Sequence, residues 1–109
     1  MIVAIGDVHA QIPQRTAVES AMRTAQSAAR EQDGCLHYGF SEALGEPGHY
    51  VIVQRWRDRN ALEAHYRSAS FVGYQTAIAP LLVADSEVEI YTVDDAFRPQ
   101  APPRFDQDE

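Results

Sequence analysis

Tyr50-Val-Ile-Val-Gln-Arg-Trp56 is the stretch of sequence that decides the fold. It is rich in β-branched and aromatic residues, which favour a pleated, half-buried surface, so it predicts a strand. Gln54 and Trp56 are two residues apart and therefore share one face of that strand. Apolar residues occur on both faces, which predicts a strand with apolar contacts on each side.

The residues before this strand predict a hairpin. Cys35–Leu44 is a second candidate strand that places Leu36, Tyr38 and Phe40 on one side. Gly45-Glu46-Pro47-Gly48 is a loop, and its length favours an antiparallel connection to the strand that follows. Further towards the N-terminus, residues 1–10 predict another strand, with an irregularity at Gly6.

Two helical regions flank the hairpin. Thr16-Ala17-Val18-Glu19 matches a capping box, so a helix is expected to start near Thr16 and to stop at Asp33-Gly34. Its apolar residues recur at helical spacing and are small: Val18, Met22, Ala25 and Ala29. After the hairpin, Asp58 is a good N-cap for residues 59–67, and a second piece after Ser68 carries Phe71, Tyr74, Ile78 and Leu81 at helical spacing up to Pro80.

Residues 87–93 predict a last strand, which completes the order β-α-β-β-α-β. This order favours the ferredoxin-like split βαβ fold, an α+β class with a four-stranded antiparallel sheet and helices on one face. The other sheet face is left apolar and open, which implies a partner, most simply a second copy of the chain. We expect one domain over residues 1–93 and a flexible, acidic, proline-containing tail over residues 94–109.

Composition excludes several classes of function. The chain has 109 residues, no lysine, nine arginines and 16 acidic residues, for a formal charge of −7. This balance disfavours binding to nucleic acid, and the absence of lysine excludes Schiff-base chemistry. No apolar run is long enough for a membrane span, and no basic segment precedes the first apolar stretch as in a secretory signal. Cys35 is the single cysteine, so we expect no internal disulfide and a cytoplasmic location.

Four segments of the chain together resemble the antibiotic biosynthesis monooxygenase (ABM) domain family of dimeric α/β barrels. The segments, which keep their order and spacing within residues 1–93, are Asp33–Tyr38, Tyr50–Trp56, Asp58–His65 and Phe71–Leu82. The resemblance implies a homodimer with facing sheets and a pocket between sheet and helices in each subunit. In the monooxygenases of the family, an electron-rich aromatic substrate is deprotonated and its anion reduces dioxygen without flavin or metal.

The resemblance also implies roles for particular residues. Trp56 matches a Trp of many relatives, whose indole could hold a substrate oxygen or simply fill the core. His65 stands where the family often has a His that could accept the phenolic proton, or it could bridge the two helices. Relatives often carry Glu where this chain has Gln54, so a His–carboxylate pair through position 54 is not available.

Asp7 corresponds to an Asn that heme-degrading relatives use. On the helix-facing side of the sheet it could act as a base with a raised pKa, and otherwise it is a solvated residue at a strand end. The His that those relatives carry on the second helix corresponds to Gln75. Heme degradation in these relatives needs an Asn, a Trp and a His, and this chain has Asp7, Trp56 and Gln75 at those positions. Two of the three residues differ, so we reject heme degradation as the leading interpretation.

The remaining candidates are polar or aromatic residues of the second helical region. Asn60 could hold substrate or be an exposed helix start, and Phe71 and Tyr74 could line an apolar wall or only pack the core. Tyr66 and Tyr74 could donate hydrogen bonds to an oxyanion. His9, His37 and His49 show no metal-ligand spacing, so no metal site is expected.

The sequence thus predicts a cofactor-independent monooxygenase that oxidises a quinol, anthrone or related polycyclic phenol with dioxygen. In this hypothesis Trp56, His65 and Asp7 are catalytic, and the substrate contacts Asn60, Tyr66, Phe71, Tyr74 and Gln75. Two alternatives stay open: a non-redox protein that binds a small aromatic ligand, and a cyclase or isomerase on the same barrel. All three hypotheses require the same feature, an acid–base residue in an apolar pocket, so this feature does not separate them.

Overall fold

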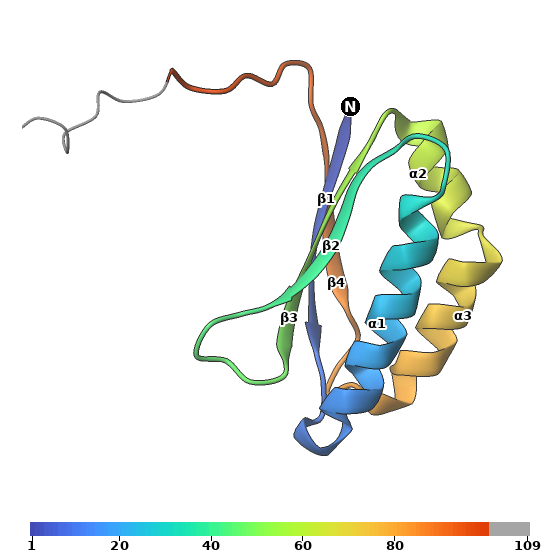
Figure 1. Ribbon diagram of the computed structural model, residues 1–109, viewed down its shortest axis with the longest axis vertical. Helices are drawn as coiled ribbons and strands as arrows, with labels where there is room; N and C mark the ends of the chain where they lie inside the picture. The colour runs from blue at the N-terminus through green and yellow to red at the C-terminus, as the bar shows by residue number, and fades with distance from the viewer. Residues whose placement is uncertain (101–109) are drawn as a thin grey trace, which may run out of the picture.

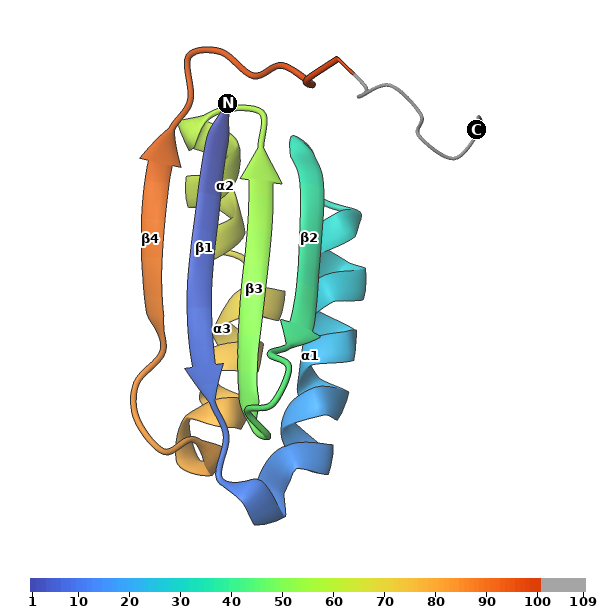
Figure 2. The same cartoon turned by 90° about the vertical axis from the view of Figure 1, so that its left-hand side faces the viewer.

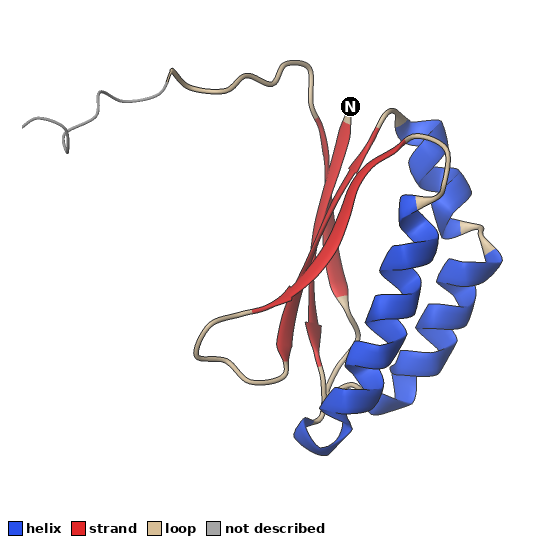
Figure 3. Ribbon diagram, in the orientation of Figure 1, coloured by secondary structure: helices blue, strands red, loops and turns tan. Residues whose placement is uncertain are grey.

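The computed structural model describes residues 1–100 and contains one antiparallel sheet with its helices on one side (Figures 1 and 3). The strands lie in the order β2-β3-β1-β4, and Figure 2 views the sheet from its open face. The elements are β1 (Ile2–His9), α1 (Arg15–Arg30), β2 (Cys35–Glu42), β3 (His49–Trp56), α2 (Arg59–Tyr66), α3 (Ala69–Ile78) and β4 (Glu87–Thr92), with 3-10 turns at Ile12–Gln14 and Ala79–Leu81. This arrangement confirms the predicted ferredoxin-like fold.

Alternation along β1 divides its residues between two environments. Ile2, Ala4 and Val8 are buried against the helices, whereas Val3, Ile5, Asp7 and His9 face the open side. Strand β3 pairs with β1 in antiparallel register, from Ile2 opposite Trp56 to His9 opposite His49. Direct partners share a face, so Trp56, Gln54, Ile52 and Tyr50 also point to the helices.

Gly6 is required by close packing and not by a bulge. The register of β1 runs through Gly6 without a shift, so the predicted irregularity is wrong. A Cβ atom at Gly6 would stand 2.8 Å from the carbonyl oxygen of Glu87 and 2.7 Å from a methyl carbon of Val88. The lack of a side chain therefore lets β4 lie close on this side of β1.

Helix α1 packs its small residues on the sheet as expected, with Val18, Met22, Ala25 and Ala29 buried. The predicted capping box is wrong, because the helix begins at Arg15, directly after the 3-10 turn, and its N-cap is Gln14. Glu19 instead accepts a hydrogen bond from the Tyr50 hydroxyl on β3 at 2.6 Å. The N-caps of the other two helices are Asp58, as predicted, and Ser68.

Side chains of α1 also cover the free edge of β2. Arg30 Nε donates to the carbonyl oxygen of Tyr38 at 2.9 Å, and the Phe40 backbone N–H donates to Gln26 Oε1 at 3.2 Å. These bonds occupy edge groups that would otherwise be free to pair with another strand. A register shift between Cys35 and His37 leaves Leu36 half exposed, so the prediction that Leu36 shares the inner side of Tyr38 and Phe40 is wrong.

The opposite edge of the sheet is more open. Every residue of β4 is exposed, including the apolar side chains of Val88 and Ile90 that point to the helix side. Among residues 1–100, no helix combines the length and the apolarity that crossing a bilayer demands. The predicted tail begins at residue 94; its described part, residues 94–100, contains no helix or strand, and the rest lies outside the described residues.

Candidate functional site

A small cavity lies between the helix side of the sheet and helix α3. Its volume is about 60 Å³, which corresponds to roughly two water molecules at the ~30 Å³ that each occupies in the liquid. We call it the inner cavity. Its lining is mostly aromatic and aliphatic: Val8, Tyr38, Phe40, Ile52, Gln54, Tyr66, Phe71, Tyr74, Gln75, Ile78, Ser86 and Val88.

Trp56 is fully buried beside this cavity, at the end of β3. Its indole Nε1–H donates to Gln54 Oε1 at 2.9 Å, and its ring stacks on the His65 imidazole with 4.8 Å between centroids. The indole N–H therefore already has an acceptor within the protein. In this structure Trp56 supports the histidine with its ring face, and its N–H fixes the amide of Gln54.

Hydrogen bonds around His65 define which of its nitrogens carries the proton. His65 Nδ1 lies 2.8 Å from Gln32 Oε1, while Gln32 Nε2 donates to the Ser70 hydroxyl oxygen at 3.3 Å. In this orientation the Gln32 amide oxygen faces Nδ1 and can only accept, so Nδ1 is the donor. In the neutral ring Nε2 then keeps its lone pair and is an acceptor.

The surroundings of His65 keep it neutral. The residue is 3% exposed, and burial lowers the pKa of its imidazole from 6.5 to about 4. Nε2 is buried and has no hydrogen-bond partner among the described residues. The rings of Tyr38, Tyr66 and Phe71 pack on the imidazole with centroids 4.9–5.6 Å away. These three residues also line the inner cavity, so His65 lies one side chain behind its wall.

Tyr74 contributes a second buried polar group, on the cavity itself. Its hydroxyl oxygen makes no hydrogen bond to any residue of the described part of the chain, and burial raises its pKa above the usual value. A tyrosine in this state is a neutral donor at physiological pH. Tyr74 thus lines the inner cavity with its hydroxyl buried, and the neutral imidazole of His65 lies behind the same wall.

The structure brings some of the predicted site residues together and separates others. Tyr66, Phe71, Tyr74 and Gln75 all line the inner cavity, with Trp56 and His65 behind it. Asn60 is exposed and lies in a separate surface depression beside Gln32 and His65, not in the inner cavity.

Asp7 lies on the open face of the sheet, opposite to the side on which a base for the cavity would have to stand. Asp7 Oδ1 is 2.7 Å from His49 Nε2, and His49 Nδ1 is 3.1 Å from Glu46 Oε1. The hydrogen bond to Asp7, followed by that to Glu46, raises the pKa of His49. Asp7 thus pairs with a histidine on the open face and does not contact the inner cavity.

Sequence reasoning missed two polar residues of the site. Gln54 is one of them, and its parity with Trp56 on β3 is the signal that places it on the inner face. Gln32 had no signal, because it lies 33 residues before His65, in the turn after α1. No group of three His, Cys, Asp or Glu within residues 1–100 is arranged to hold a metal ion.

Comparison with known proteins connects this chain to one family. The model of the family "Antibiotic biosynthesis monooxygenase" matches residues 1–77. Two curated proteins are similar in sequence: sll1783 of Synechocystis sp., uncharacterized, at 25% identity over 84% of this chain, and the monooxygenase candidate YcnE of Bacillus subtilis, at 30% identity over 55% of this chain. The aligned part of the chain spans 63% of the length of each.

Solved structures share the fold. A protein from Deinococcus radiodurans, described as a candidate antibiotic biosynthesis monooxygenase, superposes with a TM-score of 0.86 at 24% identity, covering 93% of this chain and all of its own. Rv0793 from Mycobacterium tuberculosis superposes with a TM-score of 0.81 at 24% identity, covering 87% of this chain and 96% of its own. With the match over residues 1–77, the chain belongs to the antibiotic biosynthesis monooxygenase family.

Proposed function

We propose that the protein is a cofactor-independent monooxygenase that oxidises a quinol, anthrone or related polycyclic phenol with dioxygen. The observation that carries the proposal is the buried, neutral His65, whose Nδ1–H is held by Gln32 and whose Nε2 lone pair is left to accept a proton. Membership of the family and the similarity to candidate monooxygenases support the reaction class.

In this reaction the protein removes a proton, and the substrate anion supplies the electrons. His65 Nε2 takes the proton of a phenol or of an anthrone enol once one of the rings that cover the imidazole has moved aside, and Tyr74 donates to the resulting oxyanion. The imidazolium and the oxyanion attract each other strongly at contact, and this attraction offsets part of the cost that burial places on charging His65. The anion reduces dioxygen: one oxygen atom becomes the new quinone carbonyl of an oxidised anthrone, and the other leaves as water with the two hydrogens removed from carbon.

A homodimer is the second part of the proposal. On the open face, Val3, Ile5, Val51 and Val53 form an aliphatic centre at which Ile5 is 40% exposed. Apolar side chains in the middle of a sheet face are typical of a face that a partner covers. We therefore expect the wild type to sediment as a dimer in analytical ultracentrifugation and Ile5→Glu to sediment as a monomer, whereas a monomeric wild type would contradict the dimer.

Oxygen uptake tests the proposed reaction. Chelator-treated protein is mixed with 1,4-naphthalenediol or dithranol, and the rate is corrected for autoxidation. We expect saturable uptake that inserts one oxygen atom and releases the other as water, giving 2-hydroxy-1,4-naphthoquinone from the diol and the anthraquinone from dithranol. Formation of unsubstituted 1,4-naphthoquinone with hydrogen peroxide would contradict a monooxygenase. His65→Ala should lower the uptake mainly below the pKa of the free substrate, and His49→Ala, which removes an open-face histidine, is the matched control.

Each negative outcome points to a named alternative. If turnover is equal in wild type and His65→Ala at every pH, His65 is not the base. If uptake never exceeds autoxidation while the ligand still binds under nitrogen, the non-redox binding function is correct. If the substrate is converted without oxygen, the protein is a cyclase or an isomerase.

A further inference from the structure

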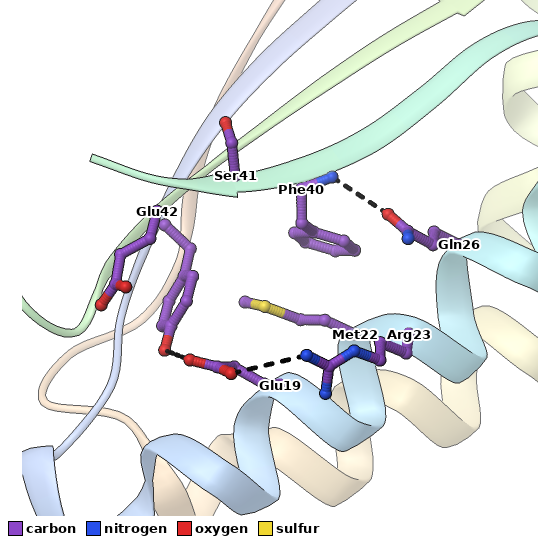
Figure 4. A pocket seen from close by; sticks show the side chains of 8 residues that line it. Glu19, Met22, Arg23, Gln26, Phe40, Ser41 and Glu42 are labelled. Carbon is purple, nitrogen blue, oxygen red and sulfur yellow. Dashed lines mark hydrogen bonds and ion pairs between the residues drawn. The ribbon is translucent and has the colours of Figure 1, made fainter. Parts of the chain in front are cut away.

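Phe40 lines the inner cavity and also a second cavity. The second one, which we call the outer cavity, lies between α1 and β2 and has a volume of about 240 Å³. Figure 4 shows Phe40, Met22 and Gln26 pointing into it, with Glu19 and Arg23 at the α1 side. Phe40 is the one residue that the structure, over its described range, places in the lining of both cavities.

The inner cavity alone is too small for the ligand that the proposed function requires. The inner cavity, at about 60 Å³, is smaller than the engineered cavity of about 150 Å³ that is known to admit benzene. The two volumes together approach the lower limit of about 300 Å³ for small-molecule sites. A bicyclic phenol beside Tyr74 would therefore need the space that the Phe40 ring now closes.

The packing of Phe40 permits its ring to move while its backbone stays in place. The ring is only partly buried and contacts both halves of the core, with the Tyr38 and Tyr74 ring centroids 5.9 Å and 5.7 Å away. Its backbone N–H is held by Gln26 Oε1, and its strand neighbour is Ile52 on β3. A change of side-chain rotamer thus suffices, without any change in the sheet.

The outer cavity favours a neutral polar group on the ligand. Its two carboxylates already have basic partners: Glu19 lies 3.8 Å from Arg23 and accepts from Tyr50, and Glu42 lies 3.7 Å from Arg15. A charged ligand would have to break one of these pairs. Met22 and Phe40 give the cavity an apolar wall, and the Gln26 amide NH₂ can donate to a ligand oxygen.

We propose that the two cavities are the halves of one ligand site and that Phe40 is the movable partition between them. The ligand is an aromatic molecule of two or more rings, and its neutral, oxygen-bearing end lies in the outer cavity. This proposal rests on the proposed function, because it takes the inner cavity as the place where the phenol reacts. Phe40 then determines which ligand sizes the protein accepts.

The test follows 1-naphthol under nitrogen, so that no turnover is needed. Met22 lines only the outer cavity and Ile78 only the inner one, so their methyl groups report on each half separately. In protein labelled at the Met and Ile methyl groups, we expect bound naphthol to give NOEs to both residues. By calorimetry, Phe40→Ala and Phe40→Leu should bind about 10-fold tighter or more, because the apparent Kd scales inversely with the populated fraction of the open state.

Phe40→Trp provides the opposite change, since the larger ring should keep the partition closed, weaken binding and remove the NOE to Met22. The proposal is overturned if the NOEs stay confined to one cavity in both wild type and Phe40→Ala. It is also overturned if the Kd for naphthol is the same in wild type, Phe40→Ala and Phe40→Leu, or if naphthol binds to none of these proteins. Naphthol contacts in both cavities without oxygen uptake would overturn only the proposed function, and oxygen uptake with contacts in one cavity would overturn only the partition.

Discussion

The two faces of the sheet contain the same residue type in opposite chemical states. On the helix side, His65 is enclosed by Trp56, Tyr38 and Phe71, and burial lowers its pKa to about 4. On the open side, His49 lies between the carboxylates of Asp7 and Glu46, and its pKa is raised. The first histidine is a neutral acceptor, and the second has a carboxylate oxygen within hydrogen-bond distance of each ring nitrogen.

This difference shows how the fold assigns chemistry to positions. A proton acceptor in a dry, aromatic environment is useful for deprotonating a phenol, because the anion that forms is shielded from water. A histidine held by two carboxylates has both ring nitrogens occupied and serves to link β1, β3 and the Glu46 loop. The site therefore belongs to the helix side, and the open side is suited to assembly.

The largest expected effect is on stability, from Trp56→Ala. Removal of a fully buried indole creates a cavity, leaves the Gln54 amide oxygen without its donor and takes away the surface on which His65 stacks. We expect a loss of about 3–5 kcal/mol in the free energy of unfolding, measured by urea denaturation. Arg55→Ala, one residue away on the open face, should cost about 0.5 kcal/mol or less. Equal losses in the two variants would remove the distinction between the faces.

The next effect is the pH dependence that His65 gives to stability. Its pKa is about 4 in the folded chain and 6.5 for the exposed side chain, so between these values the unfolded state binds a proton that the folded state does not. Stability therefore falls as the pH drops from 6.5 towards 4, by up to about 3 kcal/mol at ~1.4 kcal/mol per pKa unit. His65→Phe should lose this part of the pH dependence in urea titrations at pH 7.5, 6.5, 5.5 and 4.5. Identical pH profiles would show that His65 is not kept neutral by burial.

Glycine substitutions compare the packing of the faces directly. Gly6 lies among the helix-facing residues of β1, where a Cβ would meet a backbone oxygen at 2.8 Å, whereas a Cβ at Gly39 on the open side meets nothing closer than 3.4 Å. Gly6→Ala should destabilise by about 1–3 kcal/mol through overpacking. Gly39→Ala should be neutral or slightly stabilising, since alanine restricts the unfolded chain. Thermal denaturation of the two variants checks both signs, and a neutral Gly6→Ala would show that β4 can move away from β1 without cost.

The smallest effect concerns the open-face ion pair. His49 gains its raised pKa first from Asp7, so Asp7→Asn should bring that pKa back towards 6.5, and Glu46→Gln should do so to a smaller extent. Because the pKa is raised in the folded state, the interaction stabilises below pH 6.5 and is lost as the pH rises through the folded pKa. An NMR titration of the imidazole proton resonances measures the shift. No change in Asp7→Asn would mean that the contact does not persist in solution.

The order of elements and most faces were predictable from the sequence, because they depend on local patterns. Alternation through Tyr50–Trp56 placed Gln54 beside Trp56, and the spacing of Val18, Met22, Ala25 and Ala29 identified the buried face of α1. Asp58 was recognised as an N-cap because its side chain acts on a backbone N–H only three residues away, that of Ala61.

The errors come from contacts between distant residues or from irregular backbone. Glu19 looked like part of a capping box, but it bonds to Tyr50, 31 residues away. The register shift before His37 turned Leu36 outward, and parity alone could not tell on which face Asp7 would lie. The pairing of Gln32 with His65, which sets the proton position of the candidate base, follows only from the assembled fold.

The central claim, that His65 is a neutral proton acceptor at Nε2, is tested most directly by the protonation state of its two ring nitrogens. In protein labelled with ¹⁵N-histidine, long-range ¹H–¹⁵N correlation spectra from pH 8 to pH 4 separate protonated from unprotonated ring nitrogens, and the spectrum of His65→Phe identifies the resonances of His65. We predict that Nδ1 is protonated and Nε2 unprotonated at pH 7, with a midpoint near pH 4. A His65 that carries its proton on Nε2 at pH 7, or that titrates near pH 6.5, would contradict the account.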